Sequence, residues 1–263
     1  MHFLTKKLAI ITLSKSGYIL AQKLKQHFVL AKVYTHQQVR REENSFVKLA
    51  DLIADIFPKV EGIVFIGPCG IAVRSILPHL QHKTLDPAVV VVDVGARWAI
   101  SLVSGHEGGA NNLAYAVSNI LYCLPVITTT SEAQKDILAG IGCKRGVSKS
   151  RLKACLLMAL DKLGLDLSRV RHLATIDLKK QETGLLELSK ELDIPLLFLP
   201  KERLLACWQS YNKSQFVYER VGVFGVAEPA CLVSGHFPEL ILEKTICKGV
   251  SIALARESCM SLV

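Results

Sequence analysis

Short β-branched runs alternate with stretches of helical periodicity along the first half of the chain. The runs "KLAIITLS", "GIVFIG" and "AVVVVDV" have the length and composition of buried strands. Between the first two, Leu20, Leu24 and Phe28 recur every four residues, as on one face of an amphipathic helix. Alternation of this kind predicts an α/β fold with an open, largely parallel sheet.

Two connections in this half are also predicted. The run "RWAISLVS" follows "AVVVVDV" within a few residues, which indicates that the two strands pair as a hairpin. The apolar period of "SFVKLADLIADIF" predicts a helix, and either Asn44 or Ser45 is the expected N-cap because both residue types accept hydrogen bonds from a helix start.

The second half predicts a smaller, mixed α/β domain. After Ser148 the apolar residues of "RLKACLLMAL" fall on one helical face, and "VRHLATID" and "PLLFL" have the composition of strands. The segment "PELILEKTICKGVSIALAR" predicts a hairpin that turns at Lys248 and Gly249. We place the boundary in the join "SEAQKDILA", which gives an N-terminal α/β domain of residues 1–134 and a C-terminal mixed domain of residues 135–263.

Composition narrows the classes of partner. The chain of 263 residues has a formal net charge of +9, and no basic stripe with interleaved aromatic residues accompanies it. We therefore expect no nucleic acid; a small polyanionic ligand fits, and solubility alone would also explain the charge. No apolar run reaches the roughly 18 residues that span a bilayer, so no membrane is expected. The eight cysteines form no Cys-x-x-Cys pair, which disfavours structural zinc and indicates reduced thiols in the cytoplasm.

A polar, glycine-rich segment, "VSGHEGGANNLA", lies between the strand "AISLVS" and a helical pattern. Ligands of open α/β sheets bind beyond the carboxyl ends of strands, and glycines leave the N–H groups of a helix start accessible. We expect His106 and Glu107 to be the catalytic acid–base pair. A tight turn that caps the helix is the alternative. The substrate is expected to contact Gly108, Gly109, Asn111 and Asn112.

The segment "FIGPCGIAVRSI" has the same order of strand, glycine-rich turn and helix. Cys69 is either a nucleophile activated by the helix dipole or a packing residue. Arg74 either binds a carboxylate or forms a surface salt bridge. Asp93 is costly to bury without a partner. Its side chain has either a catalytic role or a structural hydrogen bond, and the sequence does not distinguish the two. The candidate substrate contacts here are Gly67, Cys69, Gly70, Arg74 and Asp93.

Two strand-to-helix connections in the second domain also carry polar residues. "GIGCKRG" places Cys143 before Lys144 and Arg145, and adjacent cations beside flexible backbone suit an anion or a solvated turn. "ATIDLKKQETGL" adds the candidates Asp177, Lys179 and Glu182, and helix capping is the alternative role of Asp177 or Glu182. Nucleotide cofactors are disfavoured, because "SKSGYILA" has one glycine where a dinucleotide fingerprint needs three and no Walker motif is present.

Taken together, these segments resemble the cobalamin biosynthesis protein G family, the cobalt-precorrin-5A hydrolases of anaerobic vitamin B12 synthesis. The first half shares "GPCGIAVRSILP", "DPAVVVVD" and "LVSGHEGGANNLA" followed by "PVITT". The second half shares "GIGCKRG", "LATIDLKKQETGLLELSKELDIPLLF", "VAEPACL" and "VSIALAR". The family usually has a middle segment, whereas "ITTTSEAQKDILAGIGCKRG" joins the halves directly here, so the chain resembles a compact form. Its second half also resembles a small stand-alone protein of the aerobic pathway.

The resemblance implies a hydrolase that opens a δ-lactone on the macrocycle of cobalt-precorrin-5A and releases acetaldehyde. It implies that His106 or Glu107 activates water and that N–H groups at Gly108 and Gly109 stabilise the oxyanion. Cobalt arrives within the substrate, so no cofactor and no protein metal site are expected. The resemblance leaves open whether the chain forms a homodimer or contacts other enzymes of the pathway. The cations expected to hold substrate carboxylates are Arg74, Lys144 and Arg145.

Two other functions are compatible with the residues. One is a tetrapyrrole-binding or carrier protein of the same pathway, without chemistry of its own. The other is an unrelated α/β nucleotide-binding protein, against which the missing phosphate loop already counts.

Overall fold

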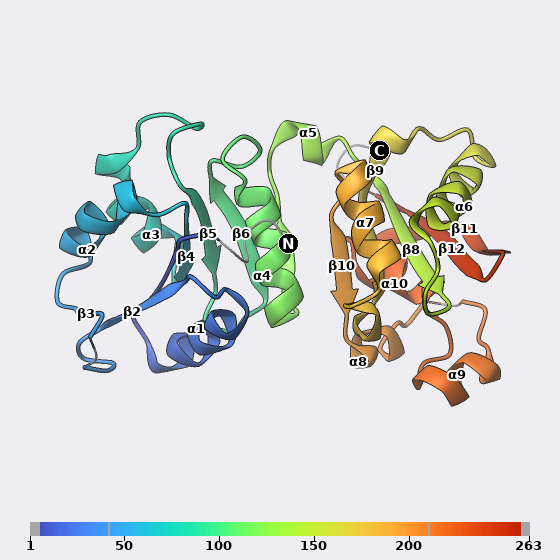
Figure 1. Ribbon diagram of the computed structural model, residues 1–263, viewed down its shortest axis with the longest axis horizontal. Helices are drawn as coiled ribbons and strands as arrows, with labels where there is room; N and C mark the ends of the chain where they lie inside the picture. The colour runs from blue at the N-terminus through green and yellow to red at the C-terminus, as the bar shows by residue number, and fades with distance from the viewer. Residues whose placement is uncertain (1–5, 42, 210, 259–263) are drawn as a thin grey trace. The chain divides into compact units, whose positions relative to one another are not determined.

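The computed structural model describes residues 6–41, 43–209 and 211–258. The chain forms two units, residues 1–129 and 130–263, each with its own sheet and helices (Figure 1). The short helix α5 (Thr130–Ala133) belongs to the second unit.

Unit 1 is built on a seven-stranded sheet in the order β3-β2-β1-β4-β5-β6-β7. Strands β1 to β5 run parallel, β6 pairs antiparallel with β5, and β7 runs parallel to β6. The largely parallel sheet and the β5–β6 hairpin are therefore confirmed. The strands are β1 Leu8–Thr12, β2 Lys32–His36, β3 Ser45–Phe46, β4 Gly62–Ile66, β5 Ala88–Val92, β6 Trp98–Val103 and β7 Leu124–Val126.

Helices cover both faces of this sheet. Ile10 and Val90 pack in one hydrophobic cluster with α1 and α4, whereas Ile11 and Val91 pack in another with α2 and α3. A strand covered on both faces has no polar side, which explains why β5 reads as an unbroken apolar run. The helices are α1 Lys15–His27, α2 Leu49–Ile56, α3 Cys69–Ile76 and α4 Ala110–Leu121, with short 3-10 turns at Phe57–Lys59 and Leu77–His79.

The predicted cap of the second helix is wrong. Ser45 pairs with Thr35 of β2 and forms, with Phe46, the edge strand β3. The carbonyl oxygen of Asn44 accepts a hydrogen bond from the N–H of Thr35 at 3.4 Å. Helix α2 begins only at Leu49, after Lys48. Pairing with β2 therefore overrides the local preference of these two residues for a helix start.

Unit 2 has a five-stranded mixed sheet in the order β10-β9-β8-β12-β11. Strands β8, β9 and β10 are parallel, β12 is antiparallel to β8, and β11 is antiparallel to β12. Lys248 and Gly249 have positive φ (47° and 84°), the backbone of a two-residue hairpin turn, as predicted. The strands are β8 Ile137–Cys143, β9 Val170–Ile176, β10 Leu196–Leu199, β11 Pro238–Cys247 and β12 Val250–Glu257.

Helices α6 and α7 pack on one face of this sheet and α10 on the other. The approach of α10 is very close: a Cβ at Gly140 of β8 would overlap the carbonyl oxygen of Ala227 in α10. No helix in the described ranges is both long and apolar enough to cross a lipid bilayer. The helices are α6 Lys149–Asp161, α7 Thr183–Leu192, α8 Lys201–Leu205, α9 Gln215–Val221 and α10 Ala227–Val233, with 3-10 turns at Leu167–Arg169 and Asp177–Lys179.

The two units are expected to fold separately. The clusters of unit 1 lie within residues 8–127 and those of unit 2 within residues 137–255, so each unit has a core of its own. We expect fragments 1–129 and 130–263 each to unfold in one cooperative transition in urea, followed by circular dichroism. Two fragments without a transition would show that neither core is sufficient alone.

Candidate functional site

The glycine-rich segment of unit 1 forms a tight loop between β6 and α4. Ser104 and Gly109 have positive φ (59° and 87°), so the chain changes direction at both ends of the loop. The N–H of Ala110 donates to the carbonyl oxygen of Ser104 at 3.0 Å, and α4 begins at Ala110, as predicted. His106 and Glu107 are exposed on the loop.

Glu107 has a charged partner. Lys83, from the connection before β5, donates a hydrogen bond to the carboxylate of Glu107. This bond lowers the pKa of Glu107, and the nearby charge of His106 adds to the effect. A carboxylate of lowered pKa is a weak proton acceptor at neutral pH. The geometry therefore favours Glu107 as a fixed negative charge and not as a base.

The two asparagines that follow the loop differ in their surroundings. Asn111 is only 7% exposed; its Oδ1 accepts a hydrogen bond from Ser101 Oγ at 2.8 Å, and its Nδ2 donates to Thr129 Oγ1 at 3.1 Å. These bonds fix the start of α4 to β6 and give Asn111 a packing role that the sequence did not separate from ligand binding. Asn112 is exposed beside the loop.

The direction of β6 decides which residues the loop can reach. Val103, at the end of β6, pairs with Val89, near the start of β5. The loop therefore lies at the edge of the sheet where β1, β4 and β5 begin. The other candidates of unit 1 follow the carboxyl ends of β4 and β5, at the opposite edge, so the structure does not bring them together with His106. These residues are Gly67, Cys69, Gly70 and Asp93.

Asp93 closes the β5–β6 turn. Its Oδ1 accepts hydrogen bonds from the N–H groups of Arg97 and Trp98 at 2.7 and 2.9 Å, and its Oδ2 accepts one from Arg97 Nε at 3.0 Å. Partial burial would raise the pKa of Asp93, but these donors outweigh it and hold the pKa below its usual value. Of the two roles left open by the sequence, the structure favours the structural hydrogen bond.

We expect Asp93→Ala to lower the free energy of unfolding of unit 1 by about 1–3 kcal/mol, because two turn N–H groups lose their acceptor. Since the folded pKa is depressed, the ionised Asp93 stabilises unit 1 above its unfolded pKa, and this stability is lost as pH falls through the folded pKa. The difference between variant and wild type should therefore shrink in acid. Urea unfolding at about pH 7 and about pH 3 measures both effects, and equal midpoints near neutrality would contradict them.

The two glycines at the start of α3 differ in their surroundings. The N–H of Gly67 donates to the carbonyl oxygen of Val92 at 2.9 Å, whereas a Cβ at Gly70 would meet nothing within 4 Å. Cys69 is half-buried as the first residue of α3. Arg74 is exposed in the last turn of that helix, one turn after Gly70.

In unit 2 the two predicted anion-binding connections meet. They follow the adjacent parallel strands β8 and β9, whose carboxyl ends share one edge of the sheet. Glu182, 8% exposed, joins them: its Oε1 accepts a hydrogen bond from the N–H of Gly146 at 2.7 Å and its Oε2 one from Lys179 Nζ at 3.0 Å. Burial would raise the pKa of Glu182, but Lys179, Gly146 and Arg145 together lower it. Glu182 is therefore an ionised bridge between the two connections.

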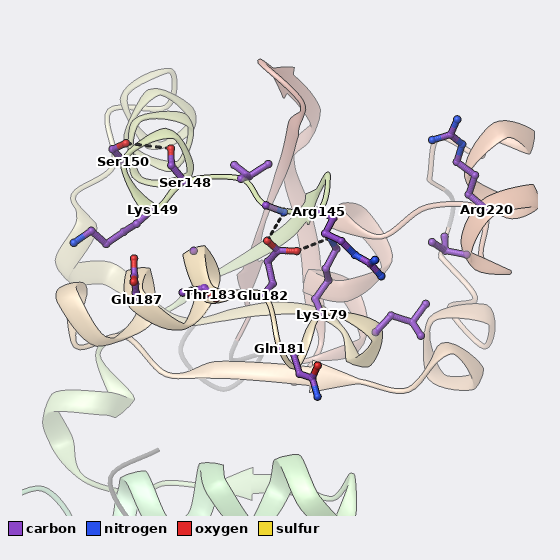
Figure 2. A pocket seen from close by; sticks show the side chains of 15 residues that line it. Arg145, Ser148, Lys149, Ser150, Lys179, Gln181, Glu182, Thr183, Glu187 and Arg220 are labelled. Atoms are coloured by element: carbon purple, nitrogen blue, oxygen red, sulfur yellow. Dashed lines mark hydrogen bonds and ion pairs between the residues drawn. The ribbon is translucent and has the colours of Figure 1, made fainter.

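A pocket of about 1040 Å³ opens beside this bridge. Its lining comes from the connection after β8, the starts of α6 and α7, and the end of α9. Figure 2 shows Arg145 and Lys179 near Glu182 at the centre, with Lys149 on the α6 side and Arg220 across the pocket on α9. Helix starts and cations both favour anionic groups, so this pocket suits an anionic ligand.

The remaining candidates of unit 2 lie at the same edge but outside this lining. Lys144 donates its N–H to the carbonyl oxygen of Gly249 at 3.1 Å, and its side chain lies against Gly249 at the β11–β12 turn. Lys144 and Arg145 therefore have different surroundings despite being adjacent. Burial raises the pKa of the Cys143 thiol, which makes it a poor nucleophile at neutral pH. Asp177 begins the 3-10 turn after β9.

Two models of one protein family match the chain. The model described as cobalamin synthesis G N-terminal matches residues 51–132, and the model described as cobalamin synthesis G C-terminus matches residues 137–255. A protein of Methanocaldococcus jannaschii named "Probable cobalt-precorrin-5A hydrolase" is 33% identical over 278 residues, which cover 75% of this chain and 86% of the relative. The chain belongs to the cobalamin synthesis G family.

Other members of the cobalamin synthesis G family align over more of the chain. The "Cobalt-precorrin-5A hydrolase" of Priestia megaterium is 24% identical and covers 94% of each chain. That alignment extends over 352 residues, more than the 263 of this chain, so the relative contains residues without a counterpart here.

A crystal structure of CobE, described as a protein from the cobalamin (vitamin B12) biosynthetic pathway, is 34% identical, covers 46% of this chain and 90% of that chain, and has a TM-score of 0.44.

Two pocket cations of this cobalamin synthesis G protein, Lys149 and Arg220, were missed from the sequence. Lys149 directly follows the expected cap Ser148, but only the adjacency of β8 and β9 places its helix start beside that of α7. Arg220 lies on α9, in a segment whose apolar residues show no clear period. In residues 6–41, 43–209 and 211–258 no three His, Cys, Asp or Glu side chains gather to hold a metal ion, and the cysteines there form no disulfide.

Proposed function

We propose that this chain is a cobalt-precorrin-5A hydrolase of cobalamin biosynthesis, which opens the δ-lactone of the macrocycle and releases acetaldehyde. The observation that carries the proposal is the match of both family models, together with curated relatives of this name over nearly the whole chain. It is proposed as a cytoplasmic enzyme whose cobalt is part of the substrate, with no cofactor of its own.

The loop before α4 is proposed as the place of lactone opening. His106, exposed on this loop, takes a proton from water as the hydroxide adds to the lactone carbonyl. The resulting oxyanion is held by N–H groups at Gly108 and Gly109, where α4 begins. Collapse of this intermediate breaks the acyl C–O bond and gives a carboxylic acid, which loses its proton to solvent, while His106 returns its proton to the departing oxygen. Glu107, ionised beside Lys83, stabilises the protonated imidazole.

The experiment is incubation of the purified chain with cobalt-precorrin-5A under anaerobic conditions, with acetaldehyde followed over time. We expect more than one equivalent of acetaldehyde for each protein molecule. A change in the spectrum of the corrinoid without acetaldehyde would identify a carrier instead and would refute the hydrolase.

A further inference from the structure

The charged groups around the pocket of unit 2 come from three stretches of the chain, within residues 145–150, 178–187 and 220–221. Two acidic side chains, Glu182 and Glu187, line the pocket as well, so the cations are in excess. Figure 2 shows the cations distributed from one side of the pocket to the other and not gathered at one point. The four cations are Arg145 after β8, Lys149 at the start of α6, Lys179 before α7 and Arg220 on α9.

The cations differ in how far the fold neutralises them. Lys149 forms an ion pair with Glu191 at 2.5 Å, and Lys179 is held by Glu182. The guanidinium of Arg220 lies 4.3 Å from the centroid of the Phe216 ring, a contact that orients the group and leaves its charge available. The two arginines of the pocket thus offer planar groups suited to binding carboxylates through two hydrogen bonds.

The size and the spread of charge together indicate the class of ligand. A single small anion would need cations that converge on one point. A volume of about 1040 Å³ lies at the upper end of small-molecule pockets, which range over roughly 300–1,000 Å³. We propose that this pocket binds a large ligand through several separate carboxylates, with Arg145, Lys179 and Arg220 as contacts. Identification of these groups as the carboxylate side chains of a precorrin rests on the proposed function.

Glu182 acts in this proposal as a positioning residue. Its carboxylate holds Lys179 and the N–H of Gly146, and so fixes one side of the pocket before any ligand binds. Gly184 supports the same arrangement, since a Cβ there would overlap the carbonyl oxygen of Val147. The start of α7 therefore packs directly on the connection after β8. A lining fixed in this way loses little freedom on binding.

The test uses the full chain and two porphyrin probes. Uroporphyrin carries a carboxylate on every side chain and coproporphyrin on half of them, so we expect uroporphyrin to bind more tightly, with an affinity that falls as salt rises. We expect Arg145→Gln and Arg220→Gln each to weaken uroporphyrin binding about tenfold in a fluorescence titration. The matched control is Lys162→Gln, which removes the same charge at the far end of α6 and should bind as wild type.

Glu182→Gln separates positioning from simple charge. The substitution removes a negative charge from the lining, so charge alone predicts tighter binding of uroporphyrin. If Glu182 positions Lys179 and the connection after β8, binding should instead become several-fold weaker, because an amide cannot accept both hydrogen bonds. Tighter binding would remove the positioning role.

Three results would overturn the pocket proposal. The first is wild-type affinity for uroporphyrin in both arginine variants, and the second is an equal loss of affinity in Lys162→Gln. The third is displacement of uroporphyrin by inorganic phosphate more readily than by tricarballylate, which would indicate a phosphate site. Binding of uroporphyrin needs no turnover. A chain that binds it through Arg145 and Arg220 but releases no acetaldehyde from cobalt-precorrin-5A would keep the pocket and lose the proposed function. Normal turnover with an unchanged KM in both arginine variants would instead keep the proposed function and refute the pocket proposal.

Discussion

We expect the His106→Ala variant to release acetaldehyde about 10²–10⁴-fold more slowly than the wild type, the usual contribution of a general acid or base. The imidazole is exposed on the loop before α4, and the only other titratable side chain of this loop, Glu107, has a lowered pKa beside Lys83. Binding of the corrinoid should survive, because the backbone donors at Gly108 and Gly109 remain. Single-turnover release of acetaldehyde, together with a spectroscopic binding titration, separates the two effects.

The controls distinguish chemistry from folding. His27→Ala removes an exposed histidine from the last turn of α1 and should keep the wild-type rate. Glu107→Gln should slow release less than His106→Ala does, because the carboxylate acts as a charge and not as the base. A pure capping loop would lose about 1 kcal/mol of stability and keep its rate, so thermal melts of each variant are required. Wild-type rates in both loop variants would show that the chemistry does not take place at this loop.

The Gly140→Val variant is expected to lose about 3–5 kcal/mol from the free energy of unfolding of unit 2, as overpacking against a backbone allows little relaxation. A side chain at this position would meet the carbonyl of Ala227 and the N–H of Cys231, so α10 would have to leave the sheet. Urea unfolding should show a destabilised unit 2 transition beside an unchanged unit 1 transition.

Gly70→Ala is the matched control for this substitution. Gly70 lies in α3, and a Cβ there meets nothing within 4 Å. Since alanine is the better helix former, the variant should be as stable as the wild type or more stable by about 0.5–1 kcal/mol. A Gly140→Val protein that unfolds at the wild-type midpoint would show that α10 does not pack this closely on β8.

Strand composition and turn chemistry account for the parts of the fold that could be predicted. The unbroken apolar run of β5 requires cover on both faces, and Lys248-Gly249 matches a two-residue turn. The start of α2 could not be predicted in the same way. Ser45 has the local chemistry of a cap, but it lies in β3 because it pairs with β2. That pairing is a tertiary contact, and no pattern in the residues next to Ser45 indicates it.

The candidate site likewise has parts that local sequence rules could place and parts that they could not. The connections holding Arg145 and Glu182 follow parallel strands, so the rule for open sheets places them at one edge, and they meet there. His106 follows β6, which runs antiparallel to β5, so the same rule places its loop at the opposite edge, away from the other candidates of unit 1. Arg220 depends on the path of the chain between β10 and α10, where no periodic pattern indicates which residues face the pocket.

The turn held by Asp93 also determines which changes of chain length unit 1 can tolerate. One residue added between Asp93 and Trp98 would shift β6 against β5 by one position and exchange its two faces. Ser101 would then turn away from Asn111, and the start of α4 would lose its attachment. An insertion at the opposite end of β6 from His106 would thus misplace the loop that carries it.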